Sequence, residues 1–130
     1  MALVPILNEE QLLDKQPNQI TKELLLVILA DKHSRKIIES TIESPRSAMD
    51  LANNFGVPLN TAYRRLKMLE KCKILKISGI ITDDGRKAFL YQSRIRVIKV
   101  NCIGNSCEVE IIPNDLIDNT RDFSLQRSTL

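Results

Sequence analysis

Apolar residues recur at helical spacing through the first half of the chain and alternate with polar ones through the second half. The pattern predicts five helices, over residues 8–13, 20–29, 32–43, 48–55 and 59–73. Asp31 and Ser47 are good N-caps for the third and fourth helices, and Gly56 ends the fourth because glycine turns easily through positive φ. Two short helices joined by a tight turn therefore precede the strands.

From Leu75 onward the apolar period is two, which is typical of β-strands. Turn residues separate strands 75–81 and 88–91 at Thr82-Asp83-Asp84-Gly85. Gly104-Asn105 separates strands 95–102 and 107–112 in the same way. After Pro113 the chain is polar with isolated apolar residues, so we expect a frayed end or a short docking helix.

These elements predict an α+β fold, mainly α, because 130 residues hold one compact core with extensions. We expect N-terminal helices in residues 1–30, a helix-turn-helix with a hairpin in 31–93, an additional β-hairpin in 94–112 and a tail in 113–130. Leu24 to Leu29 is too apolar to be covered by the helical unit alone. The sequence therefore predicts a homodimer formed through the N-terminal helices, with the second hairpin as a further candidate surface.

Neither a membrane span nor a secretory leader is evident in the chain. No apolar run approaches the roughly 20 residues of a spanning helix, and the first residues do not show the basic segment and cleavage site of a signal peptide. We expect a cytoplasmic protein that does not enter a membrane.

The net charge of +3 is unevenly distributed. Residues 31–99 carry 15 Lys and Arg against seven acidic residues, a net +8, whereas residues 1–30 carry −2 and residues 100–130 carry −3. A basic middle between acidic ends indicates a polyanionic partner for the middle alone, although a solvated charged surface would look similar. The positions of the charges on the helices must decide.

The helix expected over 59–73 separates apolar from basic residues. Its inner stripe is Leu59, Ala62, Leu66 and Leu69. The opposite side carries Asn60, Arg64, Lys67 and Lys71, flanked by Thr61, Tyr63 and Arg65. Arg and Asn match base edges in the major groove, and Lys usually meets phosphate. The alternatives are pairing with Glu70 or exposure to water for the bases, and packing on the hairpin for Tyr63.

The segments that carry a family resemblance are Leu29-Ala30-Asp31, Arg35-Lys36-Ile37-Ile38, Ala48-Met49-Asp50-Leu51-Ala52, the run from Gly56 to Leu66, and Leu69-Glu70. In this order, over about residues 29–93, they resemble the ArsR-like winged helix-turn-helix regulators of archaea and bacteria. The resemblance implies a homodimer that binds double-stranded DNA near a promoter. It places the helix after Gly56 in the major groove and makes the first hairpin the wing.

The chain departs from this family at three places. Metal-sensing members carry cysteines in the helix expected here over 48–55, which has none, so we expect neither metal nor cofactor. Pro58 stands where the family often has a serine cap, which suggests a shifted helix start with proline as an early helical residue. Asp83-Asp84 at the wing tip repels phosphate, which leaves the wing contact to Arg86 and Lys87.

No catalytic set is evident, and we do not expect an enzyme. His33 is the sole histidine, and Glu108 and Glu110 share one face of a strand as solvated carboxylates often do. With a two-residue turn at Gly104-Asn105, Cys102 faces Cys107 closely enough for a disulfide. The two are a candidate redox pair, although two thiols are the default in a reducing cytosol.

The sequence therefore predicts a transcriptional regulator that binds specific double-stranded DNA. One alternative is a winged-helix module for protein–protein assembly in the transcription machinery, on which the basic face is incidental. Another is RNA binding through the same fold.

Overall fold

The computed structural model describes residues 21–117. They form α2 (Lys22–Ala30), α3 (Lys32–Ser40), α4 (Ala48–Asn54) and α5 (Leu59–Lys71), followed by β1 (Leu75–Asp83), β2 (Arg86–Ser93), β3 (Ile95–Ile103) and β4 (Ser106–Pro113). β1 pairs with β2, and β3 pairs with β4, each as an antiparallel two-stranded sheet. The expected helix 8–13 and the tail from residue 118 lie outside the described residues.

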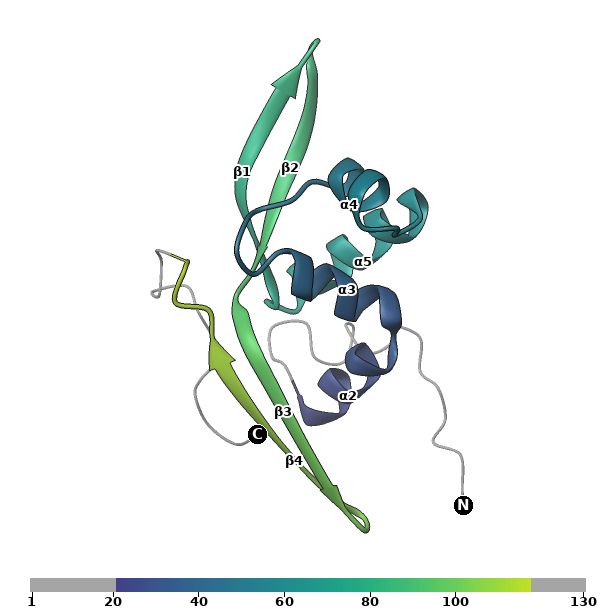
Figure 1. Ribbon diagram of the computed structural model, residues 1–130, viewed down its shortest axis with the longest axis vertical. Coiled ribbons are helices and arrows are strands. Elements are labelled where there is room, and N and C mark those ends of the chain that lie inside the picture. The colour runs from purple at the N-terminus through teal and green to yellow at the C-terminus, as the bar shows by residue number, and fades with distance from the viewer. Residues whose placement is uncertain (1–20, 118–130) are drawn as a thin grey trace.

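The two hairpins point toward opposite ends of the molecule, and the helices lie along one side between them (Figure 1). The expected α+β class is confirmed, but "mainly α" is wrong. The helices have 9, 9, 7 and 13 residues and the strands 9, 8, 9 and 8. β2 is longer than the alternation of apolar residues predicted. Its antiparallel pairing with β1 also includes polar residues such as Arg86 and Gln92, which that alternation does not mark.

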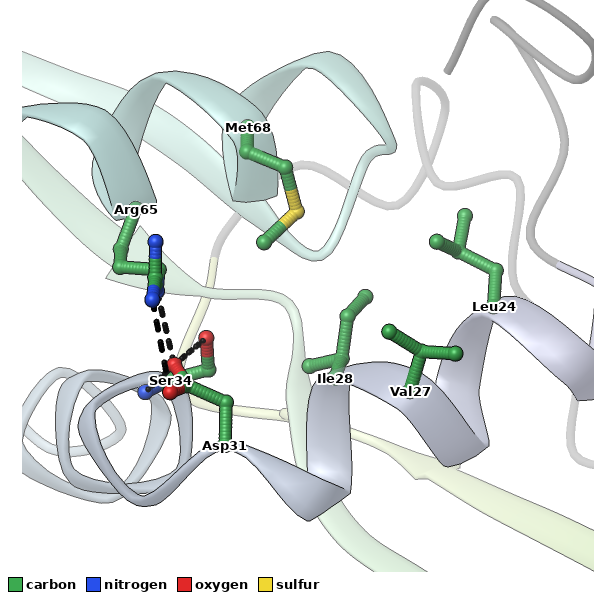
Figure 2. A pocket seen from close by; sticks show the side chains of 7 residues that line it. All are labelled: Leu24, Val27, Ile28, Asp31, Ser34, Arg65 and Met68. Carbon is green, nitrogen blue, oxygen red and sulfur yellow. Dashed lines mark hydrogen bonds and ion pairs between the residues drawn. The ribbon is translucent and has the colours of Figure 1, made fainter. Parts of the chain in front are cut away.

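Asp31 connects the first two described helices. It follows α2 as its C-cap, and its side chain accepts the backbone N–H of Ser34 at 2.9 Å as the N-cap of α3 (Figure 2). α3 ends at Ser40 rather than at the expected Glu43. Thr41 is buried there, donates its hydroxyl to the carbonyl of Ile37, and accepts the backbone N–H of Ser93, which directs the chain toward β2.

The turn between α4 and α5 follows from its residues. Ser47 and Asp50 form the expected capping box at the start of α4, and Gly56 has φ +71° after its end. The buried Val57 then donates its N–H to the carbonyl of Leu51. Pro58 is the N-cap of α5 and lies outside the helix, so the suggested shift of the helix start is wrong.

Both hairpins close through two-residue turns, as the sequence predicts for Gly104-Asn105, whereas the first turn is shorter than the expected Thr82-Asp83-Asp84-Gly85 because Thr82 and Asp83 pair within the sheet. Asp84 and Gly85 both have positive φ, as a type I′ turn requires, and Gly104 takes φ +59° between β3 and β4. Tyr91 of β2 also exchanges two backbone hydrogen bonds with Arg46, of 2.8 and 2.9 Å. The β1–β2 hairpin is therefore anchored to the segment that leads into α4.

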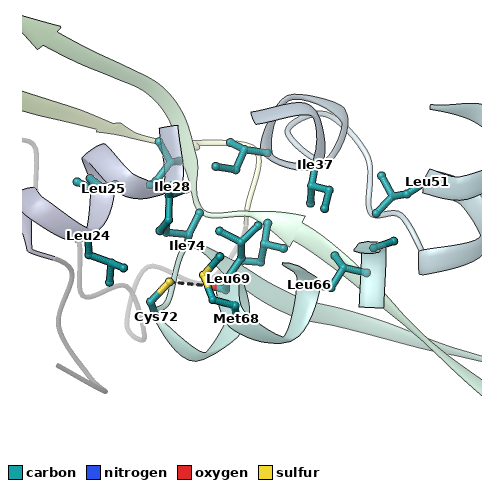
Figure 3. Close-up of a cluster of buried hydrophobic side chains, with 14 of the residues drawn as sticks. Leu24, Leu25, Ile28, Ile37, Leu51, Leu66, Met68, Leu69, Cys72 and Ile74 are labelled. Atoms are coloured by element: carbon teal, nitrogen blue, oxygen red, sulfur yellow. Dashed lines mark hydrogen bonds between the residues drawn. The ribbon is translucent and has the colours of Figure 1, made fainter. Parts of the chain in front are cut away.

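One hydrophobic core joins the helices to both hairpins (Figure 3). It includes Leu24, Leu25 and Ile28 of α2 together with Val109 and Ile111 of β4. Three of the apolar side chains expected to need a partner are thus buried within the chain itself. Val27 of α2 remains 39% exposed and is the large apolar side chain of this helix that a partner chain could cover.

The chain after Pro113 is better anchored than we expected. Asn114 is buried, and its amide donates to the carbonyls of Ile42 and Ser93 at 2.8 and 2.9 Å. These bonds join the end of β4 to the base of β2 and the loop after α3. The expectation of a frayed end directly after Pro113 is therefore wrong for Asn114.

Candidate nucleic-acid interface

The outward side of α5 is where the sequence predicts it. Ala62, Leu66 and Leu69 are buried against the other helices. Exposed on the opposite side are Asn60, Tyr63, Arg64, Lys67 and Lys71, with Thr61 half-buried at the flank. We call these five exposed residues the α5 outer stripe. It contains three cations, one amide and no carboxylate.

Leu59 does not belong to the inner stripe as expected. It is exposed at the first position of the helix, beyond the edge of the core, and Met68 is buried in addition to the expected residues. Thr61, Arg65, Met68 and Cys72 recur at spacings of four, three and four along α5. Arg65 and Met68 of this second stripe lie beside Leu24, Val27 and Ile28 of α2, and its spacing is the signal that the sequence interpretation missed.

Arg65 differs from its neighbour Arg64. Its Nε donates to Oδ2 of Asp31 at 2.8 Å, and its side chain is only 15% exposed, so this arginine ties α5 to the α2–α3 junction (Figure 2). Burial raises the pKa of Asp31, but hydrogen bonds from Arg65 and Ser34 outweigh burial and bring the pKa down from 3.8 to about 2. The structure thus gives Arg65 a structural role that its inclusion among DNA-binding candidates did not anticipate.

A small cavity of about 70 Å³ adjoins this ion pair. Leu24, Val27, Ile28 and Met68 line its apolar part, and Asp31, Ser34 and Arg65 its polar end (Figure 2). Because Asp31 already accepts hydrogen bonds from Arg65 and Ser34, the polar end is internally satisfied. The volume is near that of a few water molecules.

Among residues 21–117, no side chain caps the N-terminus of α5. Pro58 has no side-chain donor or acceptor, and the first turn contains no acidic residue. The first backbone N–H groups of a helix carry partial positive charge and attract anions. The same helix end therefore offers backbone donors next to Asn60.

The tip of the β1–β2 hairpin carries the two expected bases. Arg86 and Lys87 are exposed directly after the turn, and Asp84 is exposed within it. Asp84 has φ +51°, a conformation that aspartate tolerates better than most residues. The acid at the tip thus serves the turn geometry.

Tyr91 lies on β2 at the base of this hairpin. Its pKa is raised, first by burial and then by the negative charges of Glu70 and Tyr63 on α5. Tyr63 itself remains exposed.

The cysteines fall into two environments. Cys102 and Cys107 are directly opposite in the β3–β4 ladder, as expected, and they form a disulfide. Cys72 is a buried thiol whose pKa burial raises from 9.0 to about 12. Within residues 21–117, no three His, Cys, Asp or Glu side chains gather in an arrangement that could hold a metal ion.

Glu108 and Glu110 are both exposed, and Glu110 lies 3.8 Å from Nζ of Lys99. Of the helices in the described part of the chain, none has the length and apolar character to cross a membrane. A scan against protein-family models and a search of curated proteins found no match to this chain.

Proposed function

We propose that this protein is a transcriptional regulator that binds specific double-stranded DNA through a winged helix-turn-helix unit. In this proposal α4 and α5 are the helix-turn-helix, β1–β2 is the wing, and the protein acts in the cytoplasm. The observation that carries the proposal is the α5 outer stripe, in which exposed cations and an amide follow one helical face with no carboxylate. Charge, spacing and the order of the elements agree with a DNA-reading helix.

Each group on this surface suits a particular DNA contact. Arg64 and Asn60 lie toward the N-terminal half of α5, the part of a reading helix that reaches base edges. Lys67 and Lys71 lie further along and suit phosphates. The uncapped N-terminus of α5, and Arg86 and Lys87 on the wing, add further phosphate contacts. Arg65 is assigned to the fold, because Asp31 already holds it.

The proposal includes a homodimer. A two-fold pair of reading helices doubles the contacted sequence, since dimers bind two half-sites about one helical turn apart. Val27 on the exposed side of α2 supplies an apolar position for such an interface. The proposed DNA contacts of the α5 outer stripe do not depend on the protein being a dimer.

Selection of bound sequences from a random duplex pool, followed by fluorescence anisotropy at several salt concentrations, tests the proposal. Four Lys and Arg contacts to phosphate per protomer give a slope of log K against log salt of about −3 to −4 per protomer. A selected motif with that slope is the expected result. Absence of duplex binding would favour a protein-assembly module, and preference for RNA of the same sequence would favour an RNA-binding role.

A further inference from the structure

Large apolar side chains stand exposed on both strands of the wing. Ile77, Ile80 and Ile81 of β1 and Phe89 of β2 are between 41% and 56% exposed. A freestanding two-stranded hairpin has no second layer to bury them, and water-exposed apolar groups on such a hairpin indicate a contact surface. The strand register shows how they are divided between its faces.

Residues directly opposite in an antiparallel pair share a face, and the face alternates along each strand. The pairs Thr82–Lys87, Ile80–Phe89 and Ile77–Tyr91 therefore lie on one face, which we call the wing's apolar face. Ile81 pairs with Ala88 on the other face, together with Arg86. Ile77, Ile80 and Phe89, three of the four exposed apolar side chains, thus share one face. Ile81 lies on the opposite face.

The apolar face runs from the tip of the hairpin to Tyr91 at its base. Phe89 packs edge-on against Tyr91 with ring centroids 6.5 Å apart, and Tyr91 pairs with Arg46 in the segment that leads into α4. At the other end of the face, Lys87 is exposed beside the tip. The strand pairs Thr82–Lys87, Ile80–Phe89 and Ile77–Tyr91 contain no carboxylate.

This combination favours a nucleic-acid occupant over a second copy of the chain. A stable dimer buries about 800 Å² per partner, far more than three half-exposed side chains offer. Lys87 is exposed on the same face, in the Thr82–Lys87 pair next to the tip, and complements a phosphate backbone. Apolar side chains that enter a minor groove beside such a cation unstack a base step and bend the duplex.

We propose that Ile80 and Phe89 form an apolar wedge that opens the minor groove beside the reading helix and bends the bound DNA. The inference rests on the proposed function and adds a bend to it. Sequences with an easily unstacked pyrimidine–purine step at the wing position would then be preferred even without a polar contact there.

The test uses the full chain and a duplex with a donor and an acceptor dye at its two ends. Ile80→Thr and Ile81→Thr are a matched pair, because both keep a β-branched side chain and both positions are exposed, at 56% and 45%, on opposite faces. Phe89→Ala is the second wedge variant. Anisotropy measures affinity, energy transfer measures the bend, and thermal unfolding checks the fold.

We expect wild type and Ile81→Thr to shorten the end-to-end distance of the duplex equally. Ile80→Thr and Phe89→Ala should leave it straight and bind on the order of tenfold more weakly. If wild type binds the duplex without bending it, the wedge is wrong and the proposed function is unaffected. Equal losses of bend and affinity in Ile80→Thr and Ile81→Thr would also overturn the wedge alone. A wild-type chain that binds no duplex overturns the proposed function itself.

Discussion

Nε of Arg65 lies 2.8 Å from Oδ2 of Asp31, so two residues 34 positions apart fix α5 against the start of α3. Successive side chains on a helix point about 100° apart. That rotation turns Arg64 toward solvent and Arg65 toward Asp31. Two adjacent arginines of the same helix therefore have separate roles, one on the outer stripe and one in the fold.

Loss of this ion pair should destabilise the fold in a pH-dependent way. The folded-state pKa of Asp31 is about 2 against an ordinary 3.8, so its charge stabilises the fold fully above about pH 5, and the stabilisation is lost as pH falls through 2. Asp31→Asn, which keeps a side chain able to cap α3, should cost about 2 kcal/mol at pH 7. Urea unfolding of wild type and variant from pH 7 down to pH 2 measures the difference.

The two unfolding curves should converge as pH falls to 2, where the carboxyl is protonated in the unfolded chain and about half protonated in the folded chain. Arg64→Ala is the control for neighbouring charge, and it should change stability by less than about 0.5 kcal/mol. A constant difference between Asp31→Asn and wild type at all pH values would show that the ion pair is not its source.

The Cys102–Cys107 disulfide should stabilise its hairpin without acting on DNA. It closes a short loop at the tip of β3–β4, at the opposite end of the molecule from the wing (Figure 1). Chain entropy then gives it about 2 kcal/mol at most. The Cys102→Ser/Cys107→Ser variant should bind the selected duplex as tightly as wild type under reducing and oxidising conditions. Weaker binding by a variant with an unchanged circular dichroism spectrum would instead make the pair part of DNA recognition.

Val27 should carry the proposed dimer interface. Val27→Lys places a charge on the exposed side of α2 without entering the core of Leu24, Leu25 and Ile28. Sedimentation should show wild type as a dimer and the variant as a monomer of unchanged melting temperature. Ile103→Lys, at the 74% exposed tip of the second hairpin, is the control. If only the Ile103 variant dissociates, the interface lies on β3–β4 and the assignment to α2 is wrong.

Local signals in the sequence predicted the elements well. Ser47 and Asp50 specify the start of α4, Gly56 specifies its end, and the Gly104-Asn105 turn specifies the register that places Cys102 opposite Cys107. Each of these features depends on residues a few positions apart. Side-chain and backbone chemistry at that range is readable without the fold.

Features that depend on distant residues were missed. Nothing near Arg65 indicates Asp31 as its partner, and nothing near Asn114 indicates the carbonyls of Ile42 and Ser93. The apolar surface of α2 predicted a partner chain, yet β4 supplies Val109 and Ile111 to the same core. Tertiary packing decides which apolar surfaces are covered from within the chain, and periodicity alone does not encode it.

Arg64 tests the central claim most directly. Arg64→Ala and Lys99→Ala each remove one exposed cation, the first from the α5 outer stripe and the second from an exposed pair with Glu110 on the second hairpin. Fluorescence anisotropy on the selected duplex and on a scrambled duplex, with thermal unfolding run alongside, compares the two with wild type. Arg64→Ala should lose about 1–3 kcal/mol on the selected duplex and relax the preference at one base position, while Lys99→Ala binds as wild type does. If folded Arg64→Ala binds both duplexes as tightly as wild type, α5 does not read DNA through its outer stripe, and the proposed function is contradicted.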